Sequence, residues 1–279
     1  MKRATVNPRR SGSAIARGMI YLSAAITVGV MLFLIAYILV KGVPNLTPEL
    51  FAWEYNSRNV SMLPALINTV IVTLFTLLIA VPIGICSAVF LAEYARRGSK
   101  LVSVIRVTNE TLAGIPSIVY GLFGFLAFVV TPGRSYSLIA GALTLAIMVL
   151  PTIIRTTEEA LIAVPDAYRE ASFGLGAGRL RTIFRVIVPS AMPGILSGVI
   201  LSIGRIVGET AALIFTAGTL AQVPEGIFSS VRTLAVHMYC LMSEGLYTDQ
   251  AYATAVVLLL LAALINWISN LAAKKIGKR

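Results

Sequence analysis

Long apolar segments alternate with short polar ones along most of this chain. Six segments are apolar over about 20 residues, the length with which a helix crosses the hydrocarbon core of a bilayer. They are residues 18–40, 63–92, 111–130, 137–154, 190–216 and 251–273. The second exceeds one bilayer thickness and contains Pro82, so we expect it to be tilted or kinked. The pattern predicts an all-α integral membrane protein with six transmembrane helices.

The composition supports a membrane protein. Hydrophobic residues make up 57% of the chain and charged residues 13%, whereas about a quarter of the residues of a soluble globular domain are charged. No internal repeat or soluble lobe interrupts the pattern, so we expect one transmembrane domain over 18–273. The first segment is longer than the apolar core of a signal peptide, which favours an uncleaved anchor.

Basic residues indicate the orientation. If the N-terminus is cytoplasmic, eighteen of the 23 Lys and Arg residues flank cytoplasmic ends of the segments, as the positive-inside rule requires. A basic arm (1–17), a loop (155–189) and a basic tail (274–279) are then cytoplasmic, and 217–250 is extracytoplasmic. This distribution explains the net charge of +11 without a nucleic-acid partner.

The polar stretch 170–189 interrupts the apolar pattern in the predicted cytoplasmic loop. We expect a short helix before Pro165, a second over Pro165–Phe173, and a break at the glycines that follow. From Gly178 a third, interfacial amphipathic helix is expected to lead to the next span. Its apolar face consists of Leu180, Ile183, Phe184 and Ile187.

Two charged residues lie within the fifth apolar segment. Arg205 falls near the bilayer midplane, and Glu209 follows four residues later, on the same face of an unbroken helix. Such charges cost about 2.5–3.5 kcal/mol each on insertion scales and therefore face a polar cavity or a partner. A mutual ion pair kept for structure is the alternative, although Arg before Glu is the weaker order.

Glycines recur along the same segment, at 194, 198, 204 and 208. This spacing of small residues allows close approach of another helix. We expect a pathway shared at an interface between two such subunits. Glu110, at the edge of the third segment, is interpreted as a solvated cap or as a partner for Arg106.

The predicted extracytoplasmic loop contains one further helix, over 229–241. Val231, Leu234, Ala235 and Met238 share one face of it. His237, the sole histidine, excludes a paired-His zinc site and is interpreted as an interface residue. The GLGAG run lacks the Lys-Ser/Thr ending of a phosphate-binding loop. The sequence therefore predicts no catalytic site, metal or cofactor.

The polar stretch resembles the cytoplasmic loop of ABC-importer permeases. Glu170, Ala171, Gly176 and Pro189 match its pattern of E-A-A, three residues, G, nine residues and I-x-L-P. Ser172, Val186 and Val188 depart mildly from it. In that family the loop forms coupling helices that seat in the ATP-hydrolysing subunit. The resemblance implies the type I importer fold, with both termini cytoplasmic, and ATP hydrolysis by a separate polypeptide.

Two further stretches resemble signatures of the phosphate-specific importer permeases: LAGIPSIVYGLFG (112–124) and IGRIVGETAAL (203–213). Chain length and the short arm favour the A-type subunit. The resemblance implies a multi-pass protein of the bacterial inner membrane that moves inorganic phosphate by alternating access. It also implies the partners: a second permease in a heterodimer, two ATP-binding subunits and an extracytoplasmic phosphate-binding protein.

A phosphate path suits the two charges of the fifth segment. Arg205 would attract the oxyanion, whereas Glu209 would accept a hydrogen bond from an anion that keeps a proton, as phosphate does near neutral pH. Glu209 would thus contribute selectivity or gating. Another oxyanion (sulfate, molybdate or phosphonate) is one alternative; an intramembrane enzyme or a sensor that does not transport is another.

Overall fold

The computed structural model describes residues 8–95 and 99–276, which contain helices and no strand. The expected basic arm and tail extend outside these residues, at 1–7 and 277–279. The long helices are α1 (Pro8–Gly42), α2 (Leu63–Val89), α5 (Leu138–Ile162), α8 (Val188–Val207) and α11 (Thr248–Ile276). The shorter helices are α3 (Lys100–Ala113), α4 (Ser117–Gly124), α6 (Asp166–Gly174), α7 (Arg179–Thr182), α9 (Ala211–Thr216) and α10 (Leu234–Glu244). Two 3₁₀ turns, η1 (Val43–Asn45) and η2 (Pro48–Phe51), and three π-helical segments, η3 (Phe90–Tyr94), η4 (Phe125–Val130) and η5 (Ile183–Ile187), complete the described part.

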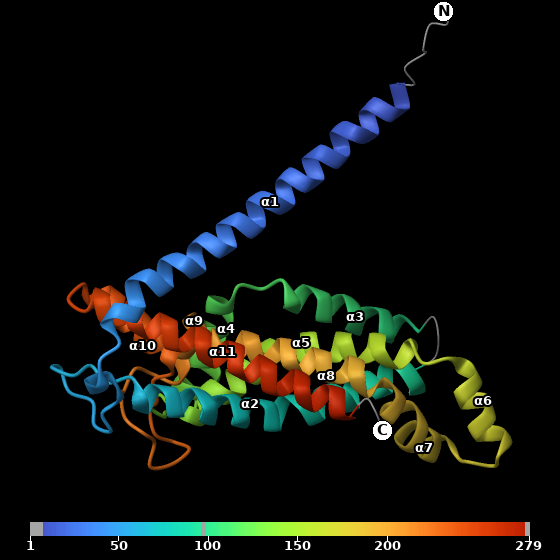
Figure 1. The fold of residues 1–279 in the computed structure, drawn as a ribbon. Coiled ribbons are helices and arrows are strands. Elements are labelled where there is room, and N and C mark those ends of the chain that lie inside the picture. Colours follow the sequence, from blue (N-terminus) through green and yellow to red (C-terminus); the bar gives the residue numbers. More distant parts are fainter. Residues whose placement is uncertain (1–7, 96–98, 277–279) are drawn as a thin grey trace, which may run out of the picture.

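Five of the predicted spans are confirmed as helices long and apolar enough to cross a membrane. They cover Ala16–Asn45, Leu63–Tyr94, Leu138–Ile162, Arg179–Val207 and Thr248–Leu271. Figure 1 shows them, apart from α1, side by side in an elongated bundle, with α6 and α7 at one end and α10 at the other. These are called the α6 end and the α10 end below.

The third predicted span is broken. In place of one helix over 111–130, Val102–Ala113 and Ser117–Val130 meet at an angle of 102°. Pro116 has no N–H to donate and restricts the residue before it to extended backbone, which ends the first helix. The carbonyl of Leu112, which an N–H at position 116 would have bonded, accepts a hydrogen bond from the Tyr120 hydroxyl at 2.7 Å.

The bent pair still runs from one end of the bundle to the other. Near the α6 end, Arg106 of α3 pairs with Glu158 in the last part of α5 at 2.6 Å. After the pair, the Arg134 guanidinium lies 4.6 Å from the centre of the Phe228 ring, in the loop before α10. Counted as one broken span, the two helices bring the number of candidate crossings in the described residues to six.

Three other boundaries differ from the sequence predictions. α5 continues to Ile162, so the helix expected before Pro165 is its last part and not a separate element. The fifth segment is not one helix: α8 ends at Val207, and α9 begins only at Ala211. α10 confirms a helix in the stretch predicted over 229–241 but begins five residues later than expected, at Leu234. It is packed into the protein, because Leu234, Ala235 and His237 are all buried.

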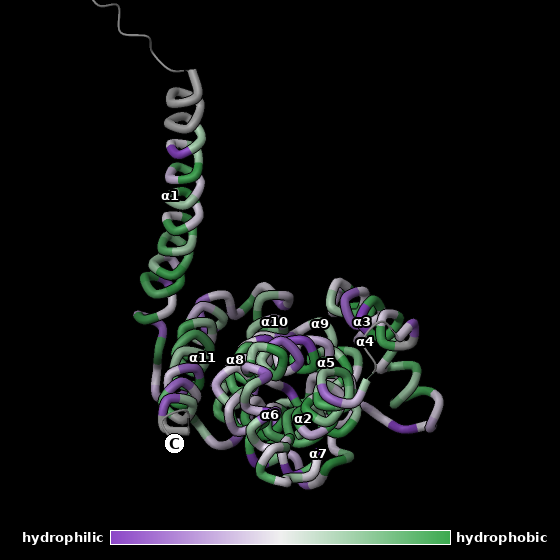
Figure 2. Tube along the Cα trace, turned by 90° about the vertical axis from the view of Figure 1, so that its right-hand side faces the viewer, coloured by the Kyte–Doolittle hydropathy of each residue, from purple (hydrophilic) through white to green (hydrophobic). Residues whose placement is uncertain are grey.

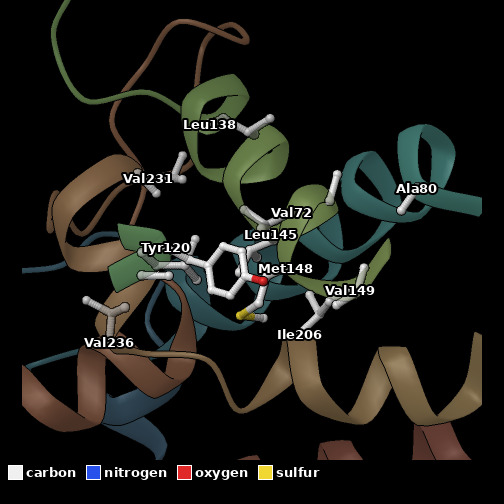
Figure 3. Packing of buried hydrophobic residues seen from close by; sticks show 14 of the residues in the cluster. Val72, Ala80, Tyr120, Leu138, Leu145, Met148, Val149, Ile206, Val231 and Val236 are labelled. Atoms are coloured by element: carbon white, nitrogen blue, oxygen red, sulfur yellow. The ribbon is translucent and has the colours of Figure 1, made fainter. Parts of the chain in front are cut away.

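α5 is the central helix, and small residues let its neighbours approach it. It packs against α2, α3, α4, α8 and α9. On α2, a residue of small or medium size faces the core at every fourth position: Asn68, Val72, Thr76, Ala80, Gly84 and Ala88. A Cβ on Gly84 would lie 2.6 Å from Ile153 of α5. Figure 3 shows Leu145, Met148 and Val149 of α5 among the buried side chains of this core.

α1 lies apart from the bundle. Figures 1 and 2 show it projecting away as one apolar helix, and none of its spanning window is buried within the chain. It touches α11 at its end, where a Cβ on Gly42 would lie 2.3 Å from the Tyr252 carbonyl oxygen. Lipid or another subunit therefore surrounds most of this helix in a membrane.

Candidate functional site

Arg205 lies on the last turn of α8 and lines a cavity of about 570 Å³. The cavity is built by three helices, and each adds polar side chains: Thr152 from α5, Ser197 from α8 and Asn266 from α11. Ile200, Leu201 and Gly204 supply the remaining wall. Of the four ion pairs found among the described residues, none includes Arg205. The arrangement offers a permanent cation together with hydroxyl and amide groups.

Glu209 does not share a helix face with Arg205, so that prediction is wrong. α8 ends at Val207, and Glu209 lies in the break between α8 and α9, with 9% of its surface exposed. Its Oε1 accepts a hydrogen bond from the Ala212 N–H at 3.1 Å, and so satisfies a donor at the start of α9. The alternative of a mutual Arg205–Glu209 ion pair is likewise absent from the pairs of the described residues.

The two broken helices of the bundle touch each other. α4 packs against α9, and a Cβ on Gly121 would lie 2.9 Å from the Ala212 Cα. Breaks inside membrane helices leave backbone groups that need partners, and transporters place substrate sites at such breaks. Glu209 therefore lies where two interrupted spans meet.

The glycines of α8 divide between two roles. A Cβ on Gly194 would lie 2.5 Å from Ala160, and one on Gly198 would lie 1.9 Å from the Thr156 Oγ1, both on α5. The helix that approaches these glycines thus belongs to the same chain, contrary to the expected interface between two subunits. Gly204 has no atom within 4 Å of a Cβ and lies beside Arg205 in the cavity wall.

α6 confirms the helix predicted over Pro165–Phe173 and carries two of the four motif residues at the end of the bundle. Glu170 and Ala171 are exposed on it, and Pro189 is the second residue of α8. Gly176 has a φ of +81°, a backbone conformation that glycine adopts readily. Leu175, next to it, is 90% exposed. This end of the bundle therefore presents a polar helix and a bare apolar side chain to its surroundings.

The amphipathic helix expected after Gly178 is the first part of the next span and does not lie apart on the membrane surface. Its predicted apolar face is split: Ile183 and Ile187 are buried, whereas Leu180 and Phe184 are exposed. The π-helical turn over Ile183–Ile187 accounts for this, because its wider turn changes the angular spacing on which the α-helical prediction rests.

The interpretation of Glu110 as a partner of Arg106 is wrong. Arg106 pairs with Glu158 of α5 at 2.6 Å, and Glu110 is exposed. Sequence reasoning also missed Asn266, although an amide within an apolar span is itself a signal of function. It could not find Thr152 or Ser197, because hydroxyl residues are common in membrane helices that serve only for packing.

Comparisons with known proteins agree with this architecture. Residues 80–279 match the protein family described as "Binding-protein-dependent transport system inner membrane component". A bacterial ABC transporter involved in the import of the acidic polysaccharide alginate has a chain with the same fold, at 17% identity and a TM-score of 0.68, covering 95% of this chain and 99% of that one. A chain of the MetNI methionine ABC transporter aligns with a TM-score of 0.59 at 22% identity, over 77% of this chain and 94% of that one.

Curated relatives are similar over most of their length. The "Probable ABC transporter permease protein YqgI" of Bacillus subtilis is 36% identical over 96% of both chains. "Phosphate transport system permease protein PstA" of Pasteurella multocida is 36% identical over 82% of both. "Phosphate transport system permease protein PstA 1" of Mycobacterium tuberculosis is 32% identical over 92% of this chain and 87% of that protein. The chain therefore belongs to the family of inner-membrane components of binding-protein-dependent transport systems.

Proposed function

We propose that this chain is the permease subunit of an ATP-driven importer that moves inorganic phosphate across the bacterial inner membrane. The observation that carries the proposal is the cavity around Arg205. A guanidinium with no carboxylate partner among the described residues, in a cavity that also holds two hydroxyl groups and one amide, suits a tetrahedral oxyanion. The names of the PstA relatives support phosphate as that oxyanion.

In this proposal, Arg205 attracts the anion through charge-assisted hydrogen bonds. Glu209 lies at the break between α8 and α9 and contributes selectivity, because an ionised carboxylate accepts a hydrogen bond only from an anion that keeps a proton. Its contact with the Ala212 N–H uses one oxygen. The second oxygen is the one proposed to act on the substrate path.

We further propose that α6 is the contact with a separate ATPase, through Glu170, Ala171 and the exposed residues around Gly176. Pro189 then leads into α8, which connects this contact with Arg205. The complete transporter would contain a second permease, two ATP-binding subunits and an extracytoplasmic phosphate-binding protein. Rocking of the helices would open the Arg205 cavity to alternate sides.

Phosphate uptake by variants with normal membrane expression tests the substrate path. Arg205→Ala is expected to lower uptake about ten- to hundredfold, which is the factor that corresponds to losing hydrogen bonds to a charged group. Glu209→Gln is expected to weaken the discrimination of phosphate against sulfate in a competition assay. Arg134→Ala, which removes a cation from the loop at the α10 end, is the matched control. Unchanged uptake in both the Arg205 and the Glu209 variant would contradict the proposed path, and stronger competition by sulfate or molybdate than by phosphate would reassign the substrate.

A further inference from the structure

α6 is held to the bundle by polar contacts. It has nine residues, and Ser172 is the one that is buried. Tyr168 and Phe173 are both exposed, so no apolar side chain of α6 anchors it in the core. At its C-terminal half, the Ser172 hydroxyl lies 2.8 Å from that of Thr182 on α7. The contacts of its N-terminal half converge on Arg169.

Arg169 makes hydrogen bonds from all three nitrogens of its guanidinium. Nε and Nη2 donate to Glu93 Oε1 at 3.2 and 2.6 Å. Nη2 also donates to the Leu161 carbonyl at 2.9 Å, and Nη1 donates to the Val164 carbonyl at 2.8 Å and to Asp166 at 3.1 Å. The side chains are 17% exposed for Arg169 and 9% for Glu93. The pair is therefore mostly buried, although it lines an open pocket of about 750 Å³, and its geometry suits charge-assisted bonds.

These contacts join three helices. Glu93 lies in η3, the π-helical end of α2. Leu161 is in the last turn of α5, whose carbonyls lack partners within the helix. Arg179 of α7 reinforces the junction: it donates to the backbone carbonyl of Glu93, and its guanidinium lies 4.7 Å from the centre of the Tyr94 ring. The ends of α2 and α5 thus meet the start of α6 at one side chain.

The covalent path from α6 to α8 is more compliant than this junction. It passes through Gly174, Gly176 and Gly178, and a Cβ on any of them would meet no atom within 4 Å. Glycine without neighbours offers little resistance to backbone rotation. A movement of α6 can therefore be absorbed in part by this link, and beyond it α6 reaches the start of the α8 span only through its packing on α7 and η5. The charged junction, in contrast, connects α6 directly to the ends of α2 and α5.

We propose that Glu93 and Arg169 form a clamp that transmits the movement of α6 to α2 and α5. The inference rests on the proposed function, in which an ATPase moves α6. Both are positioning residues: they contact neither substrate nor nucleotide in this proposal, and they act by keeping α6 and the bundle moving together. Loss of the clamp would let ATP hydrolysis proceed without transport.

The test uses the complete importer reconstituted in vesicles and measures phosphate imported per ATP hydrolysed. Glu93→Gln removes the charge of the clamp and nearly keeps its shape. The matched control is Glu158→Gln, which removes the 2.6 Å ion pair between Glu158 and Arg106. Glu158 is similarly buried, with 11% of its side chain exposed, but its ion pair does not involve α6. We expect Glu93→Gln to lower the ratio about fivefold or more, at the lower end of usual coupling energies, with ATP hydrolysis retained. The control should stay within about twofold of the wild type.

A wild-type ratio in Glu93→Gln, or an equal fall in Glu158→Gln, would overturn the clamp. If the Glu93→Gln importer does not assemble, the same ratio is measured in Arg169→Lys. A lysine keeps the positive charge, but it lacks the planar guanidinium that bonds Glu93 and two backbone carbonyls at the same time. A lowered ratio in Arg169→Lys supports the clamp, and a wild-type ratio overturns it.

A second readout separates the clamp from the proposed substrate. Spin labels are placed at Val70 of α2 and Leu260 of α11, both exposed, in a chain whose Cys86 and Cys240 are replaced by Ser. Nucleotide should change the distance between the labels in the wild type and much less in Glu93→Gln. A change of equal size in both overturns the clamp. A wild-type importer that moves no phosphate overturns the proposed function alone, since the label distances still decide the clamp.

Discussion

Gly198→Ala is expected to destabilise the contact between α8 and α5. The new Cβ would lie 1.9 Å from the Thr156 Oγ1 and 2.8 Å from the Thr156 Cβ, whereas ordinary contact begins at 3.4 Å. The two groups must therefore separate by about 1.5 Å. Rotation of the threonine moves its hydroxyl but leaves its Cβ in place, and it breaks the hydrogen bond from Oγ1 to the Thr152 carbonyl. Overpacking costs about 1–3 kcal/mol, and we expect the upper part of that range.

Unfolding of the purified protein in detergent, followed by heat or by denaturant, measures this effect. Gly29→Ala is the control, because a Cβ on Gly29 of α1 would meet no atom within 4 Å. Thr156→Gly makes room for the methyl group. In a double-mutant cycle, Gly198→Ala should therefore cost about 2 kcal/mol less in the Thr156→Gly background than alone.

The reasoning would be refuted by a Gly198→Ala protein as stable as Gly29→Ala. Strict additivity in the cycle would also refute it, because the clash with Thr156 would then not be the source of the loss.

Three further predictions concern the ends of the bundle. Burial, with the nearby charge of Arg232, lowers the pKa of His237 to about 4 from its usual 6.5. Between these pH values the unfolded chain binds a proton that the folded chain does not. The free energy of unfolding should therefore fall by about 3 kcal/mol as the pH drops from 6.5 to 4. Thermal unfolding across this range checks it, and His237→Gln should lack that part of the loss. Gly176→Ala should cost about 1–2 kcal/mol, since its φ is +81°, whereas Gly174→Ala, with helical backbone, should cost nothing; denaturant midpoints compare the two. Asn68→Ala removes the hydrogen bonds from Nδ2 to the carbonyls of Gln222 and Arg232, and limited proteolysis should then cleave the 217–233 loop several-fold faster.

The candidate site could be predicted from the sequence only where the type of a single residue indicates its surroundings. A lone Arg205 in an apolar segment predicts a polar cavity, because an uncompensated charge in lipid is costly. The error at Glu209 came from extending helical periodicity through Gly208, although apolar composition does not reveal a helix end inside a span. The partner of Arg106 was also misassigned, because Glu158 is distant in sequence and spacing along one helix reports only local pairs.

Hydropathy alone determined that the chain is helical, that it crosses a membrane several times, and that a polar segment at 170–189 interrupts the apolar pattern. These properties follow from the cost of exposing backbone and charge to lipid, which acts on each segment separately. Only the tertiary structure decided that the third and fifth segments are broken, that Thr152 and Asn266 join Arg205, and that Glu93 meets Arg169. The side-chain pairings depend on contacts between helices far apart in sequence, where packing and partner geometry select among arrangements that local pattern leaves equally allowed.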